Sequence, residues 1–169
     1  EATATRREVG LFHVALQSAL VLGQFATAFG LVRLSQESRS VDAIDLPGIR
    51  RDARRCLLLC IPVAVVGWIA APLLFALAYG DAYLDAVPAF RALLPGVVII
   101  TVQRIGAMSL IGAGRPRPVV PSVAIGLLTA LPLLAWWGSA AGAAGAGWAM
   151  TVAYAASAVV FSITLARLG

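Results

Sequence analysis

The stretch that decides the fold is CLLLCIPVAVVGWIAAPLLFALAY, residues 56–79, in which no side chain carries a charge. An apolar run of about 18 or more residues is long enough to cross the roughly 30 Å hydrocarbon core of a bilayer as a helix. No strand-like alternation competes, and within lipid only helices and closed barrels satisfy their backbone hydrogen bonds. The sequence therefore predicts an all-α, polytopic transmembrane helix bundle. Its five expected spans are residues 9–32, 56–79, 92–111, 119–137 and 142–165.

The composition of the whole chain agrees with this prediction. Of the 169 residues, 60% are hydrophobic and 12% are charged, and the mean hydropathy is +0.90. Soluble domains have about 45–50% apolar and about 25% charged residues. A soluble globular protein is therefore disfavoured. The net charge of +5 indicates no nucleic-acid partner, because the arginines cluster in the predicted loops.

The chain begins at Glu1, with neither an initiator Met nor the layout of a signal peptide. We therefore expect residues 1–169 to be a single transmembrane domain within a longer polypeptide. Cys56 and Cys60 form neither a metal-site pair nor a disulfide framework, and no cofactor or metal motif occurs. Clustered acid, base and nucleophile groups are also missing, so catalysis is disfavoured.

Arginine placement predicts the orientation, because short loops rich in basic residues stay on the cytoplasmic side. The expected loop 34–55 and the later loops on the same side carry nine arginines, against three on the other side. We therefore expect the first residue to lie outside and the last one in the cytoplasm, in a multi-pass protein of the cell membrane. The nine are Arg33, Arg39, Arg50, Arg51, Arg54, Arg55, Arg115, Arg117 and Arg167, and the three are Arg6, Arg7 and Arg91.

The arginine-rich loop 34–55 has two interpretations. Asp45, Leu46 and Pro47 are typical of a helix start, which leads into the basic segment 50–55. That segment could hold the headgroups of anionic membrane lipids. The other interpretation, a solvated determinant of topology, is favoured because the rule that basic loops stay cytoplasmic already accounts for the arginines.

Four polar side chains of span 9–32 share one helix face at 100° per residue. They are His13, Gln17, Gln24 and Thr27, which we call the polar stripe. Because such groups would be unpaired against lipid, the stripe is expected to face protein or a water-filled cavity. Hydrogen bonding between helices and the lining of a transport pathway both remain open. His13 titrates near neutral pH, but nothing else in the sequence supports proton coupling.

Arg104 is the most informative single residue, because it lies about 10 Å inside the cytoplasmic end of span 92–111. All eight acidic residues lie in loops or at a span edge, so none inside a span neutralises it. An arginine at this depth costs about 2.5–3.5 kcal/mol on insertion scales. Three outcomes follow: snorkelling, a partner outside this chain, or an anionic ligand in a wet cavity.

Two further features concern helix shape and packing. Prolines inside spans, at 62, 72, 95 and 132, are expected to bend their helices. The last span begins with small residues, including Gly142, Gly145, Ala146 and Ala149, which let another helix approach closely. That surface serves either packing within one bundle or homodimerisation.

Several short motifs, taken in order, resemble a known pattern. They are Cys60-Ile61-Pro62, Ala71-Pro72-Leu73-Leu74, residues 79–88 (YGDAYLDAVP), Leu93-Leu94-Pro95-Gly96, Ala113-Gly114-Arg115 and Gly142-Ala143-Ala144-Gly145-Ala146. Over residues 5–168 the chain resembles the C-terminal region of polysaccharide biosynthesis flippases, in the multidrug/oligosaccharidyl-lipid/polysaccharide exporter superfamily.

The resemblance implies most of the C-terminal half of a two-lobed flippase, with the N-terminal lobe elsewhere in the same polypeptide. It implies alternating access and a lipid-linked oligosaccharide or polysaccharide precursor as the substrate. Arg104 and Arg33 would then attract a diphosphate headgroup, and the polar stripe would contact sugar hydroxyls. Two alternatives are a cation-coupled multidrug exporter of the same superfamily and a non-transporting membrane scaffold subunit.

Overall fold

The computed structural model describes residues 6–37 and 46–167, without the side chains of residues 22, 25–37 and 46. The described residues form helices joined by short turns, and no strand occurs among them. The all-α fold class is therefore confirmed. The elements are α1 (Arg6–Glu37), α2 (Leu46–Tyr79), the 3₁₀ helix η1 (Asp81–Ala86), α3 (Val87–Gly112) and α4 (Val119–Ala166).

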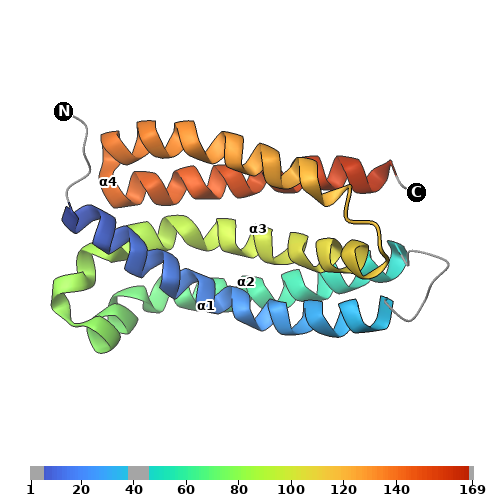
Figure 1. Ribbon diagram of the computed structural model, residues 1–169. Coiled ribbons are helices and arrows are strands. Elements are labelled where there is room, and N and C mark those ends of the chain that lie inside the picture. Colours follow the sequence, from blue (N-terminus) through green and yellow to red (C-terminus); the bar gives the residue numbers. More distant parts are fainter. Residues whose placement is uncertain (1–5, 38–45, 168–169) are drawn as a thin grey trace.

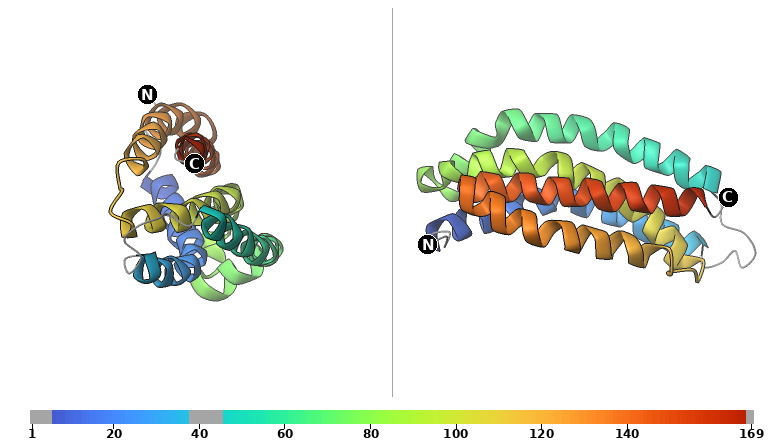
Figure 2. Two further views of the ribbon diagram at one scale, coloured as in Figure 1. Left: turned by 90° about the vertical axis from the view of Figure 1, so that its right-hand side faces the viewer. Right: turned by 90° about the horizontal axis from the view of Figure 1, so that it is seen from above.

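Helix α3 lies at the centre of the bundle. Figure 1 shows it between α4 on one side and α1 and α2 on the other, and the end view in Figure 2 agrees. Half of its most apolar stretch is buried, against 11% for the corresponding stretches of α2 and α4. Helices α2 and α4 therefore present most of their apolar surface outward.

Helix α4 reverses its direction in the middle. Ala141 (φ −131°, ψ 18°) and Gly142 (φ 58°, ψ −142°) are non-helical, and Figures 1 and 2 show the segments before and after them lying side by side. We call residues 119–140 the first arm and residues 143–166 the second arm. A positive φ is readily adopted by glycine and strains other residues, so Gly142 makes the reversal possible.

Three segments are long and apolar enough to cross a membrane: Pro47–Tyr79, Asp81–Gly112 and Val119–Ala166. The expectation of a membrane protein is met at this level. Five separate spans were predicted, and that number remains a prediction. Helix α1 is not one of these three segments, which were found among the described residues, and the side chains of residues 22 and 25–37 of α1 lie outside them.

Around the arginine-rich loop 34–55, the helix start predicted at residues 45–47 is confirmed, whereas the predicted limits of the spans 9–32 and 56–79 differ. Helix α1 continues to Glu37 and α2 already begins at Leu46, so the basic segment 50–55 is helical rather than part of a loop. The physical reason is that Pro47 is tolerated in the first turn of a helix and arginine is a good helix former. The basic side chains therefore continue the faces of α2.

The bundle buries small residues and exposes large apolar ones. Ala15, Ala71 and Ala149 are fully buried, whereas 71% of Ile69 and 78% of Leu77 are exposed. Small side chains let helix backbones approach closely, which is how helices associate when the surroundings are as apolar as the interior. This surface is the reverse of a soluble protein's and suits contact with lipid.

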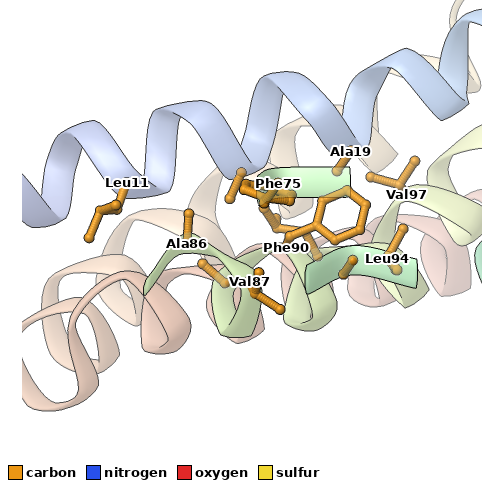
Figure 3. Close-up of a cluster of buried hydrophobic side chains, with 12 residues drawn as sticks. Leu11, Ala19, Phe75, Ala86, Val87, Phe90, Leu94 and Val97 are labelled. Carbon is orange, nitrogen blue, oxygen red and sulfur yellow. The ribbon is translucent and has the colours of Figure 1, made fainter. Parts of the chain in front are cut away.

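A cluster of buried apolar side chains joins α1, α2 and α3 near the end of the bundle where α1 begins (Figure 3). Phe75 of α2 packs edge-on against Phe90 of α3, with ring centroids 5.3 Å apart. Leu11 and Ala19 of α1 contribute to the same cluster. This packing holds α1 and α2 on α3, although they contact each other little.

The second arm of α4 packs on α3 through glycines. A Cβ added at Gly96 would lie 2.8 Å from the Cα of Thr151, and one added at Gly147 would lie 2.8 Å from the carbonyl oxygen of Ala89. The Thr151 hydroxyl also donates a hydrogen bond to the carbonyl of Ala92, at 2.6 Å. The two helices are therefore in backbone contact along this line.

The turn from α3 to α4 ends the central helix. The N–H of Arg115 donates to the carbonyl of Leu110 and that of Gly114 to the carbonyl of Ile111, the two bonds of a Schellman motif. Gly114 has φ +69°, which glycine adopts without strain. The motif Ala113-Gly114-Arg115 therefore forms the turn that ends α3.

Candidate functional site

The polar stripe lies on the outward face of α1. His13, Gln17 and Gln24 are exposed, whereas Leu11, Ala15 and Ala19, on the opposite face, pack toward α3. The described side chains of the stripe make no hydrogen bond to another described residue. They therefore do not bind the helices of this bundle together. The side chains of Thr27 and Arg33 lie outside the described residues.

The outward faces of α2 and α4 differ from that of α1. Between residues 57 and 78, α2 has no charged, hydroxyl or amide side chain. In α4, hydroxyls such as those of Thr129, Ser162 and Thr164 each donate to the carbonyl four residues earlier, which satisfies them within their own helix. Among the described helices, α1 is the one whose outward face offers amide and imidazole groups that have no hydrogen-bond partner among the described residues.

Arg104 is exposed on α3, close enough to Tyr154 of α4 for its charge to act on the phenol. Arg104 is not without an interaction partner in the structure. Because the stripe points away from α3, Arg104 and the stripe are not on one facing surface. Snorkelling and contact with an anionic ligand both stay compatible with this position.

The predicted packing residues of the last span are used within the chain. Gly142 forms the reversal of α4, and a Cβ added there would lie 2.9 Å from a carboxylate oxygen of Glu8. Gly145 lies against the carbonyl oxygen of Trp137, in the first arm. Ala149 is fully buried, and Ala146 faces Gly138. Bundle packing thus occupies the surface that homodimerisation would need.

Sequence reasoning missed a buried polar cluster centred on Gln103. Its side-chain amide donates to the hydroxyls of Ser122, at 3.3 Å, and Ser157, at 3.0 Å, and so links α3 to both arms of α4. Gln103 is 7% exposed, and its Oε1 atom has no partner among the described groups. An amide at membrane depth was the available signal. The sequence could not show which hydroxyls would meet it.

Arg91 of α3 contacts Trp68 of α2. Its Nε–H donates to the carbonyl of Trp68, at 3.0 Å, and its guanidinium lies 6.0 Å from the centroid of the Trp68 ring. In a regular helix that carbonyl would accept from residue 72, but Pro72 has no N–H. Arg91 therefore satisfies the acceptor that the proline leaves open.

We expect Arg91→Leu to lower the free energy of unfolding by about 1–3 kcal/mol, because a carbonyl in an apolar stretch of helix loses its donor. In a Pro72→Ala background the new N–H supplies that donor, so the same substitution should cost about 1 kcal/mol less. Unfolding of the four proteins in mixed detergent micelles measures this coupling. Strictly additive effects would contradict the pairing.

A groove and a pocket lie between the helices described above. A groove of about 470 Å³ between α2 and α3 is lined by apolar side chains. A smaller pocket of about 200 Å³ lies between α1 and α4, where Glu8 and Ser139 supply polar side chains. Within residues 6–37 and 46–167, no group of three or more His, Cys, Asp or Glu residues is placed to hold a metal ion.

Comparisons with known proteins add no assignment. No protein-family model, curated protein or solved structure matches this chain.

Proposed function

We propose that this chain is part of a membrane transporter that flips a lipid-linked oligosaccharide or polysaccharide precursor across the cytoplasmic membrane by alternating access. The observation that carries the proposal is the polar outward face of α1 beside the apolar outward faces of α2 and α4. Exposed amides and an imidazole at span depth are costly against lipid and favourable against a wet cavity or a second lobe. The resemblance of the ordered motifs supplies the substrate class.

The arrangement of the helices supports five passes. A straight helix of the length of α4, 48 residues, would measure about 72 Å, more than twice the hydrocarbon thickness. Each arm is long enough to cross once, so α1, α2, α3 and the two arms make five. The arginine distribution then places the start of α1 outside and the end of α4 in the cytoplasm.

Arg104 is the residue on which the substrate hypothesis is tested. A guanidinium binds phosphate oxygens in pairs, and a charge-assisted pair of this kind contributes about 1.5–3 kcal/mol. We therefore expect Arg104→Leu, in the full-length protein, to lower surface glycan export about 10-fold or more. Export is measured in a strain whose chromosomal copy is deleted, together with the amount of protein in the membrane.

Arg117→Leu is the matched control, because it removes one exposed arginine from the turn between α3 and α4. It should leave export close to the unaltered level. Normal export by Arg104→Leu at normal protein levels would reject the role of Arg104. A deletion strain with unchanged surface glycan would reject the flippase proposal itself and favour a scaffold subunit.

A further inference from the structure

An apolar groove runs between α2 and α3 on the outside of the bundle. Its volume is about 470 Å³, and α2 contributes Leu57, Ile61, Val65 and Trp68 to its wall. Helix α3 contributes the facing wall, which includes Val98. Leu57, Ile61 and Val65 are exposed rather than covered by another helix of this chain. The groove is therefore open to whatever surrounds the bundle.

The α2 face that lines the groove continues into basic residues. Arg54 precedes Leu57 by three positions and Arg50 precedes it by seven, so both lie on the same helix face as the groove lining. Both arginines are exposed. One face of α2 thus presents two guanidinium groups, followed by the apolar side chains that line the groove.

The length of the groove is close to the hydrocarbon thickness of one leaflet of a bilayer. From Leu57 to Ile69 the helix rises about 18 Å, against about 15 Å for one leaflet of a core that is about 30 Å thick. At the end away from Arg54, the indole of Trp68 lines the groove, and the guanidinium of Arg91 lies over the Trp68 ring. The groove therefore has a basic end near Arg54 and an aromatic end at Trp68, about one leaflet apart.

We propose that this groove binds one acyl chain of an anionic phospholipid, with the lipid phosphate held by Arg50 and Arg54. The leaflet is the one nearest the start of α2. Apolar walls suit a hydrocarbon chain, and the two guanidinium groups complement a negatively charged headgroup. The site goes beyond the proposed transport, and its test contains no transport measurement.

Trp68 reports directly on the groove. The full-length protein, with every other tryptophan replaced by phenylalanine, is reconstituted into phosphatidylcholine vesicles. Brominated phosphatidylglycerol or brominated phosphatidylcholine is added as a quencher at equal mole fractions. Because each arginine near an anionic lipid contributes roughly a fivefold preference, we expect quenching by phosphatidylglycerol to correspond to an apparent affinity at least about fivefold higher.

The double variant Arg50→Gln/Arg54→Gln should reduce this preference to near unity. The matched control is Arg115→Gln/Arg117→Gln, which removes the same charge from the turn at the same end of the bundle (Figure 1) and should keep the preference. Ala64→Phe, which fills the groove, should weaken Trp68 quenching by both lipids. Equal quenching by the two lipids, an unchanged preference in Arg50→Gln/Arg54→Gln, or an equal loss in the control would overturn the proposal.

A second measurement does not depend on the tryptophan replacements. Lipids that copurify with the unaltered protein are identified by mass spectrometry and compared with the membrane from which it was extracted. Enrichment of phosphatidylglycerol or another anionic phospholipid, lost in Arg50→Gln/Arg54→Gln, supports the site. Copurified lipid of the same composition as the membrane contradicts it.

Discussion

Replacing Gly145 by alanine is expected to lower the free energy of unfolding by about 3 kcal/mol or more. The added Cβ would fall on the carbonyl oxygen of Trp137, and a backbone atom cannot turn aside as a side chain can. The two arms of α4 would have to separate. Because the arms pack along their length, that separation would disturb the contacts of the second arm with α3 as well.

Gly138→Ala is the matched control for Gly145→Ala, since it adds the same methyl group to the same hairpin. Its Cβ would meet only the Cβ of Ala146, at 4.0 Å, which is an ordinary contact. We expect it to change the free energy of unfolding by less than about 1 kcal/mol. Unfolding in mixed detergent micelles, followed by circular dichroism, gives both values. Equal stabilities of the two variants would contradict the close approach of the arms.

Gly96→Ala is expected to lower the free energy of unfolding by about 2 kcal/mol. The new methyl group would lie 2.6 Å from the Thr151 hydroxyl oxygen and 2.8 Å from the Thr151 Cα. The hydroxyl can rotate but the Cα cannot, so α3 and the second arm must move apart. That movement would also stretch the hydrogen bond from Thr151 to the carbonyl of Ala92.

Gly10→Ala controls for the general effect of adding a methyl group to a glycine in a helix. A Cβ added at Gly10 would meet no atom within 4 Å, and alanine favours the helix by about 0.5–1 kcal/mol over glycine. We therefore expect Gly10→Ala to be neutral or slightly stabilising in the same measurement. A loss in Gly96→Ala no greater than in Gly10→Ala would mean that α3 and the second arm are not in backbone contact.

Hydropathy was enough to predict the class of fold and several helix limits. The prediction that a span ends at residue 79 agrees with the end of α2. The reversal of α4, at Ala141 and Gly142, falls on the last residue of the predicted gap 138–141 and the first residue of the predicted span 142–165. The limits at the arginine-rich segment were less accurate. Charge marks the end of an apolar run but not the end of a helix, so residues 50–55 continue α2 beyond the hydrophobic stretch.

The candidate site was predicted only in part. Periodicity placed His13, Gln17 and Gln24 on one face of a helix, which the backbone alone determines. It could not show whether that face points into the bundle, because this depends on which side of α1 packs on α3. The Gln103 cluster and the Arg91 contact with Trp68 join residues that are 19 or more positions apart. No local sequence pattern can therefore predict them.

That the chain is helical and apolar enough for a membrane follows from its amino-acid sequence, because the length and hydropathy of each run depend only on neighbouring residues. Which faces are buried, which glycines hold backbones in contact, and where an apolar groove meets two arginines depend on the tertiary structure. Those features require the relative placement of distant helices. That placement is set by close packing summed over many weak contacts rather than by any local signal.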